Sequence, residues 1–175
     1  MTPRVKEVVR AFELLFESIR SQKFSKTLAL HEYSERELLP LVRTFLLGYF
    51  GKSLIAEASS KLPGSRSGNG RVDFLIGNLA VELAVRTPGD SKSAVSSAAN
   101  SSEVKKLMKH NGMAILILFD FSKTPYSIKD IERFRQCPSL GKGNHNKSAF
   151  NVAYFYIESW RPIKTGKISK NIRVT

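Results

Sequence analysis

The amino-acid sequence predicts an α/β domain in which a mixed sheet of about five strands is flanked by helices, with an extra helix at the N-terminus. Two N-terminal segments repeat apolar residues at helical spacing, and residues 71–86 place two alternating apolar runs around a Gly-Asn pair. Residues 114–121 (AILILFDF) are nearly continuous in apolar residues, as in a buried strand. These patterns give the order helix, strand, hairpin, helix, strand.

The first two helices are predicted by periodicity and by capping residues. Apolar residues recur at helical spacing, with charges between them, in residues 3–21: Val5, Val8, Val9, Phe12, Leu15, Phe16 and Ile19. Ser34 followed by Glu37 is a capping-box pattern, which predicts a second helix that ends near Gly51. Pro40 should kink this helix or move its start.

The remaining elements follow from composition and alternation. The predicted strands, besides the hairpin, are residues 53–58, 114–121 and 152–157, and the predicted helices are residues 94–110 and 127–134. Residues 59–70 are rich in Ser, Gly, Lys and Arg, and they predict a flexible loop that can lie along a phosphate backbone. Residues 136–147 predict a second loop of Gly, Asn and Lys.

The hairpin carries the most informative pattern in the chain. Gly77-Asn78 predicts a two-residue loop, so that Phe74 faces Val81 and Asp73 faces Glu82. Their Cβ atoms would then lie roughly 4.5 to 5.5 Å apart, a like-charge pair that costs stability unless a cation lies between them. A divalent metal ion is the natural candidate.

Alternation assigns the two faces of the hairpin different roles. One face is wholly apolar and is predicted to be core: Val72, Phe74, Ile76, Leu79, Val81, Leu83 and Val85. The other face is the candidate site: Arg71, Asp73, Leu75, Ala80, Glu82, Ala84 and Arg86. The alternative is that Asp73 and Glu82 are solvated residues on an open sheet face.

The charge balance indicates a polyanionic partner. The 175 residues include 28 Lys and Arg against 15 Asp and Glu, for a formal charge of +13 and a pI near 10. No run of 18 or more apolar residues occurs, so nucleic acid is favoured over membrane. The single cysteine, Cys137, excludes an internal disulfide and suits a reducing cytoplasm. The candidate phosphate contacts are Lys61, Arg66, Arg71, Lys142, Lys147, Arg161, Lys164 and Lys167.

We expect one domain, residues 1–160, followed by a basic C-terminal tail, residues 161–175. In the tail a basic residue recurs every third position and no acid follows Glu158. This end is either an electrostatic arm or a solvated tail.

Asp73 and Glu82, on the two arms of the hairpin, resemble the acids of the PD-(D/E)XK nuclease superfamily, whose fold is restriction-endonuclease-like. The resemblance implies that both acids hold Mg²⁺ (or Mn²⁺) for DNA cleavage. The stretch Ser34 to Leu38, followed by the Ser/Gly loop and Asp73, also resembles archaeal Holliday-junction resolvases, which implies Glu35 as a further ligand and branched nucleic acid as a substrate. Glu57 is an alternative ligand by strand position. Many such nucleases are dimers, so a homodimer is a further expectation.

The sequence departs from the motif at one position. Ala84 occupies the place of the motif lysine, and Arg86 on the same face stays protonated, so it can stabilise phosphoryl charge but cannot act as a base. Lys105 or Lys106, on the following helix, could substitute. The hypotheses are therefore a Mg²⁺-dependent endonuclease, a catalytically impaired homologue that binds DNA, and a basic RNA-binding or protein-interaction module.

Overall fold

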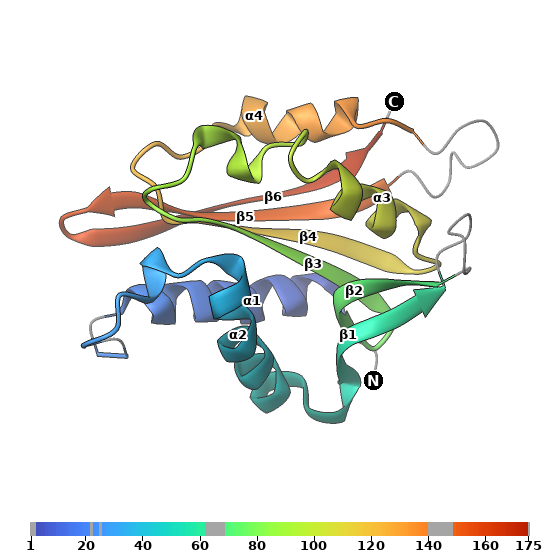
Figure 1. Cartoon of the computed structure of the whole chain (residues 1–175), viewed down its shortest axis with the longest axis horizontal. Helices are drawn as coiled ribbons and strands as arrows, with labels where there is room; N and C mark the ends of the chain where they lie inside the picture. The colour runs from blue at the N-terminus through green and yellow to red at the C-terminus, as the bar shows by residue number, and fades with distance from the viewer. Residues whose placement is uncertain (1–2, 22, 25, 62–68, 140–148, 175) are drawn as a thin grey trace.

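The computed structural model describes residues 3–21, 23–24, 26–61, 69–139 and 149–174. Within these residues six strands form one sheet in the order β1-β2-β3-β4-β5-β6, which is also their order in the chain (Figure 1). The strands are β1 (Leu54–Lys61), β2 (Asn69–Ile76), β3 (Leu79–Arg86), β4 (Met113–Asp120), β5 (Ala149–Trp160) and β6 (Ile163–Arg173). Antiparallel pairs β1/β2, β2/β3 and β5/β6 combine with parallel pairs β3/β4 and β4/β5. The predicted α/β fold with a mixed sheet is confirmed.

Helices cover both faces of the sheet. In Figure 1, α1 (Val5–Arg20) and α2 (Glu35–Phe50) lie on one side, and α3 (Ser101–Lys109) and α4 (Ile128–Glu132) lie on the other. Four short 3₁₀ segments join them within the described residues: η1 (Leu30–Glu32), η2 (Gly51–Ser53), η3 (Lys92–Val95) and η4 (Arg133–Gln136). Because β3 is covered on both faces, all of its residues are buried.

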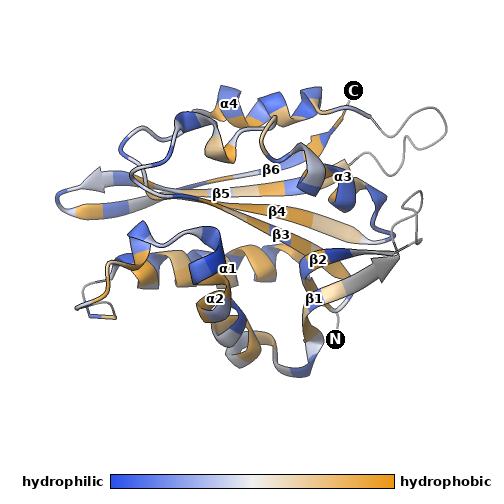
Figure 2. Cartoon of the chain, viewed as in Figure 1, coloured by the Kyte–Doolittle hydropathy of each residue, from blue (hydrophilic) through white to orange (hydrophobic). Residues whose placement is uncertain are grey.

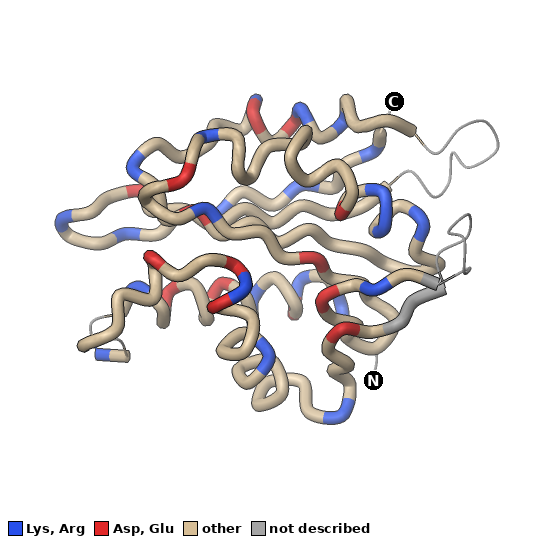
Figure 3. The backbone as a smooth tube through the Cα atoms, in the orientation of Figure 1, with Lys and Arg blue, Asp and Glu red and all other residues tan. Residues whose placement is uncertain are grey.

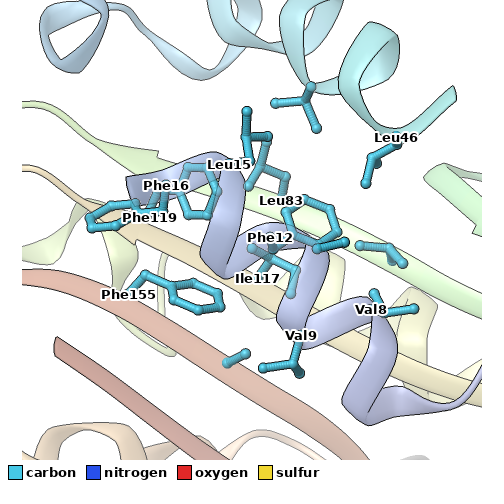
Figure 4. Packing of buried hydrophobic residues seen from close by; sticks show 14 of the residues in the cluster. Val8, Val9, Phe12, Leu15, Phe16, Leu46, Leu83, Ile117, Phe119 and Phe155 are labelled. Atoms are coloured by element: carbon cyan, nitrogen blue, oxygen red, sulfur yellow. The ribbon is translucent and has the colours of Figure 1, made fainter. Parts of the chain in front are cut away.

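Aromatic packing joins α1 to the middle of the sheet. Phe16 stacks on Phe121 with ring centroids 4.9 Å apart and meets the edge of Phe119 at 5.0 Å (Figure 4). Such contacts add to the burial of large apolar surface. Figure 2 shows hydrophobic residues concentrated on β3, β4 and β5 between the two helical layers. The same core also contains Phe74 of β2 and Leu83 of β3, the strands that carry the candidate acids.

The two predicted N-terminal helices are confirmed. The predicted capping box starts α2, where Glu37 Oε2 accepts a hydrogen bond of 2.8 Å from the backbone N–H of Ser34. Pro40 lies inside α2 and does not move its start. The carbonyl of Pro40 accepts a hydrogen bond of 2.9 Å from the hydroxyl of Thr44.

Three predicted boundaries need correction. Residues 94–110 do not form one helix, because η3 and a turn precede α3, which begins at Ser101. The loop expected at residues 59–70 overlaps two strands, because β1 continues to Lys61 and β2 begins at Asn69, and residues 62–68 lie outside the described residues. The expected tail is a strand: β6 pairs with β5 along most of its length and buries Ile172.

No helix in the described part of the chain has both the length and the hydropathy that a membrane span requires.

Candidate functional site

The hairpin that carries the candidate acids has the predicted register. Gly77 adopts a positive φ of 62°, which glycine tolerates without steric cost, and the pairs Phe74–Val81 and Ile76–Leu79 face each other across the loop. The hydrophobic face predicted for β2 and β3 lies in the core beneath α1 and α2, with one exception. Val72, past the last β2/β3 pair, packs instead in the cluster that contains Ala84 and Leu107 of α3. The opposite face of β3 is also covered, so the two acids do not stand on an open sheet face.

Asp73 lies where β2 separates from β3. The backbone pairing of these strands covers residues 74–76 and 79–81, whereas β2 continues to pair with β1 as far as Asn69. Past the last pair, the backbone N–H of Leu83 donates to Asp73 Oδ2 at 2.8 Å. The carboxylate therefore replaces the backbone acceptor that the departing strand no longer supplies, and this contact fixes its position at the fork.

Asp73 and Glu82 form a hydrogen-bonded carboxyl pair. Burial raises the pKa of Glu82 to about 8, and the negative charge of Asp73 contributes further. Burial also raises the pKa of Asp73, although its hydrogen bond from Leu83 opposes the shift. Two carboxyl groups in contact cannot both ionise readily, so the pair retains a proton to higher pH than an isolated carboxyl group does.

A lysine from α3 completes this group. The Nζ atom of Lys106 lies 2.9 Å from Oε1 of Glu82, and the side chain of Glu82 is 2% exposed. Burial by itself lowers the pKa of Lys106, but the hydrogen bond and the charges of Glu82, Glu103 and Asp73 raise it above its ordinary value. Lys106 is therefore a full positive charge at the carboxyl pair.

These groups line a cavity of about 300 Å³ between the fork and α3. Ala84, opposite α3, contributes only a methyl group to its wall, which leaves room for the longer side chain of Lys106. Glu35 from α2 reaches the same cavity, and burial, together with the charges of Asp73 and Glu103, raises its pKa to about 7. Figure 3 shows acidic positions on the neighbouring strands β1, β2 and β3.

The donor set fits a magnesium ion bound by few protein ligands. Among the described residues, no three His, Cys, Asp or Glu side chains are arranged to hold a metal ion. However, Mg²⁺ usually binds through one or two carboxylates, with water and substrate phosphate as its other ligands. Asp73 and Glu82 supply two carboxyl groups, and a bound cation would favour their ionised forms against the burial that raises both pKa values.

A second cavity opens on the other side of Asp73. Its volume is about 580 Å³, and it lies between α2 and the strands β1 and β2. Arg36 and Arg43 of α2 stand on its wall, and Glu57 of β1 shares it with Asp73. Glu57 is exposed and has a positive φ of 48°. Glu57 is therefore near Asp73 but outside the cavity that holds Glu82 and Lys106.

Arg86 lies on the same face of β3 as Glu82, as predicted, but it is not part of the site. Its guanidinium is completely buried and forms an ion pair with Asp120, its register partner on β4, at 2.7 Å. Its other donors bind the carbonyls of Lys92 and Thr124 and the hydroxyl of Ser122. A buried guanidinium needs these acceptors, and Arg86 is fully buried among them, so it is not placed to contact a phosphate.

The remaining predicted residues fall into three groups. Lys105 is exposed on α3 and does not line the cavity, so the neighbouring Lys106 is the lysine at the acids. The exposed basic residues are Arg71, Arg161, Lys164 and Lys167, and Lys167 forms an ion pair with Glu13. Outside the described residues or side chains lie Lys61, Arg66, Lys142 and Lys147.

The sequence alone did not single out Glu103 and Asn100, which also line the cavity. Asn100 is buried, and its Nδ2 donates to the carbonyl of Ser96 at 2.9 Å, immediately before α3 begins. Its polarity was the available signal, because the sequence predicts one helix at residues 94–110 and would place Asn100 inside it.

Comparison of the chain with protein-family models, with curated proteins and with solved structures returns no match.

Proposed function

We propose that this protein is a metal-dependent nuclease that hydrolyses phosphodiester bonds in DNA. The observation that carries the proposal is the grouping of Asp73, Glu82 and Lys106 in one cavity. Two buried carboxyl groups and one ammonium group, brought together from three elements, match the charges that phosphoryl transfer requires.

The order of the elements supports the same proposal. The helix α2, the antiparallel strands β1 to β3, the helix α3 and the parallel strand β4 follow one another in the chain. This order is the one expected from the resemblance to the PD-(D/E)XK superfamily, with Asp73 on the second strand and Glu82 on the third. The lysine that the motif lacks at Ala84 has a counterpart in Lys106.

Hydrolysis forms a bond from a water oxygen to phosphorus, while the bond from phosphorus to one ester oxygen breaks and that oxygen gains a proton. When bound, Mg²⁺ supplies positive charge that stabilises the phosphoryl oxygens and acidifies the attacking water. Asp73 and Glu82 would hold the ion, and Asp73 is kept in place by Leu83. Lys106 can donate a hydrogen bond to a phosphoryl oxygen or to the attacking water.

The second cavity, between α2 and the strands β1 and β2, provides a path for the nucleic-acid strand beside Asp73. Arg36 and Arg43 can bind phosphates on either side of the reacting one, while Leu39 and Leu47 offer apolar surface for a sugar or base. The formal net charge of +13 on the whole chain also favours a nucleic-acid partner. Branched DNA remains the substrate form suggested by the resemblance.

One observation favours a second candidate function, a DNA-binding homologue that does not cut. The ammonium group of Lys106 already lies 2.9 Å from Glu82, so the lysine can serve as an internal counter-ion for the carboxyl pair in place of a metal. In that case the fold and the basic surface would retain DNA binding while the chemistry is lost.

Cleavage assays distinguish the two functions. Purified protein is incubated with supercoiled plasmid and with a four-way DNA junction, each with Mg²⁺, Mn²⁺ or EDTA. The nuclease proposal expects metal-dependent strand breaks that the variants Asp73→Asn and Glu82→Gln reduce by at least about a hundredfold. Asn at position 73 can still accept the hydrogen bond from Leu83, so the fold is expected to persist.

The matched control is Asp90→Asn, which removes one exposed carboxylate outside the cavity and retains an acceptor for the N–H of Thr87. It should cut DNA at the wild-type rate. Salt-sensitive DNA binding without cleavage under any metal condition would instead establish the second function. Absence of DNA binding would contradict both.

A further inference from the structure

A wide cavity lies far from the carboxyl pair. Its volume is about 960 Å³, and it lies between the C-terminal end of α1 and the turn that joins β5 to β6. Figure 1 places this turn at the opposite end of the sheet from β1 and β2. We name it the Trp160 cleft and define it by Arg20, Lys23, Trp160, Arg161 and Lys164.

Positive charge dominates the Trp160 cleft. Its four basic side chains face two acids on the same lining, Glu17 and Glu158. An adjoining cavity of about 660 Å³ shares Arg20 and Lys23, adds Lys26 and His31, and has no acid among its lining residues. The two cavities therefore form a concave basic surface that is separate from the acids at the fork.

Arg20 is the central group of this surface. Its guanidinium carbon lies 4.8 Å from the centroid of the Trp160 ring, which holds the side chain by a cation–π contact. Its Nε is buried and has no hydrogen-bond partner in the described part of the chain. Burial, followed by the charge of Arg20, lowers the pKa of His31, and the charge of Glu32 opposes this shift.

A buried donor without an acceptor costs about 1–3 kcal/mol and calls for an explanation, such as an unobserved anion. Phosphate fits a guanidinium well, because its oxygens can accept several N–H bonds at once. Trp160 already stacks against Arg20 and lies near the edge of His31, so it is less suited to stacking on a base. Backbone phosphate is therefore the favoured ligand.

We propose that the Trp160 cleft binds the phosphate backbone of DNA and so forms a second contact surface, remote from the cutting site. Arg20 and Lys23 contact phosphates inside the cleft, and Arg161 and Lys164 contact them at the exposed β5–β6 turn. Figure 3 shows basic positions at this turn. The inference rests on the proposed function only in its choice of DNA as the polyanion, because the residues of the two surfaces do not overlap.

The chain has one tryptophan, so its emission reports on this cleft alone. The test titrates wild-type protein in EDTA with a duplex of about thirty base pairs, with inorganic phosphate and with an acidic peptide, and records tryptophan fluorescence. Binding to the cleft predicts a saturable change of emission with DNA whose affinity falls as salt rises. Asp73→Asn should give the same change, even where it abolishes cleavage.

The affinity measurement uses the double variant Arg161→Ala/Lys164→Ala, which removes two exposed charges. Each phosphate contact contributes about 0.9 to the slope of log affinity against log salt, so the variant should lower that slope by about two. The matched control is Lys123→Ala/Lys129→Ala, which removes two exposed charges near α4. The control should retain nearly the wild-type slope.

Three results would overturn the proposal. Constant emission on DNA binding would place the DNA elsewhere, and equal loss of slope in both double variants would reduce the effect to net charge. Tighter saturation by phosphate or by the acidic peptide than by DNA would assign the cleft to a small anion or to an acidic protein. A normal emission change with no cleavage would leave this inference standing and contradict only the nuclease activity.

Discussion

Lys106 lies 2.9 Å from Glu82, although 24 positions separate them in the chain. The contact brings α3 against the face of β3 on which Ala84 leaves a gap. The ammonium group of Lys106, which reaches across this gap from α3, can take the role of a lysine at position 84 of β3. The relationship gives the nuclease proposal a direct test.

The first prediction concerns the two adjacent lysines of α3. Lys106→Ala should reduce the rate of DNA cleavage by about two orders of magnitude, because it removes a charge aimed at the reacting phosphate. Lys105→Ala removes an exposed charge one residue away and should change the rate less than threefold. Cleavage is measured on plasmid at saturating metal concentration.

A rescue variant sharpens this comparison. In Lys106→Ala, the further change Ala84→Lys places an ammonium group on the strand beside Glu82, and it should restore part of the lost rate. Equal activity of the Lys105 and Lys106 variants would rule out a role for Lys106 in the reaction.

The second prediction concerns the pH dependence of stability in EDTA. Glu82 has an ordinary pKa of 4.5 when unfolded and about 8 when folded, so the folded state binds its proton more tightly. The free energy of unfolding should therefore fall as pH rises from about 4.5 to about 8, by at most about 1.4 kcal/mol per pH unit from this group. Glu35, whose folded pKa is about 7, adds to the fall below that pH.

Urea denaturation at intervals between pH 5 and pH 8 measures this slope. Glu82→Gln should flatten it, because glutamine does not titrate. Lys106→Ala should extend the fall to higher pH, with its largest effect near pH 8, because Lys106 lowers the pKa of Glu82 in the wild-type protein. A wild-type slope that persists in Glu82→Gln would show that another group controls the pH dependence.

The third prediction concerns the buried ion pair of Arg86 and Asp120. Arg86→Met should cost about 3–5 kcal/mol, because it leaves the carboxylate of Asp120 buried without its cation. Arg86→Met/Asp120→Asn should cost less than the sum of the single changes, since the neutral amide can still accept from Tyr154. Additive losses in a double-mutant cycle would indicate that the two side chains do not interact.

The fourth prediction concerns β6. A chain that ends after Trp160 should lose cooperative unfolding, because it leaves the edge of β5 and the residues covered by Ile172 exposed. Ile172→Ala should cost about 2–5 kcal/mol. Lys164→Ala/Arg173→Ala, at exposed positions of the same strand, should stay within about 0.5 kcal/mol per substitution. If calorimetry finds the truncated chain as stable as the full chain, residues 161–175 would have to be interpreted as a solvated tail.

The sequence predicted the hairpin well because its information is local. Gly77 fixes the turn, the turn fixes the register, and alternation then decides which side chains share a face. The proximity of Asp73 and Glu82 follows from that register. Whether they hold a metal ion stays a prediction.

The strand β6 escaped prediction because it is an edge strand. Its apolar residues Ile163, Ile168 and Ile172 are separated by lysines that face solvent or form ion pairs, a pattern that also suits a solvated tail. Only the pairing with β5 distinguishes the two.

Other features depend on packing between distant elements. Arg86 and Asp120 meet because β3 and β4 run parallel in one particular register, which neither strand specifies by itself. Whether Lys105 or Lys106 reaches the acids depends on how α3 is rotated about its axis against β3. The helix predicted for residues 94–110 starts too early to fix that rotation, because α3 begins at Ser101.

The sequential arrangement of the strands has a consequence for synthesis on the ribosome. Every strand after the first finds its neighbour already made, so the nascent chain can extend the sheet from one edge without waiting for a distant segment. The hairpin that carries Asp73 and Glu82 can therefore form before Lys106, the cation that contacts Glu82, has left the ribosomal exit tunnel.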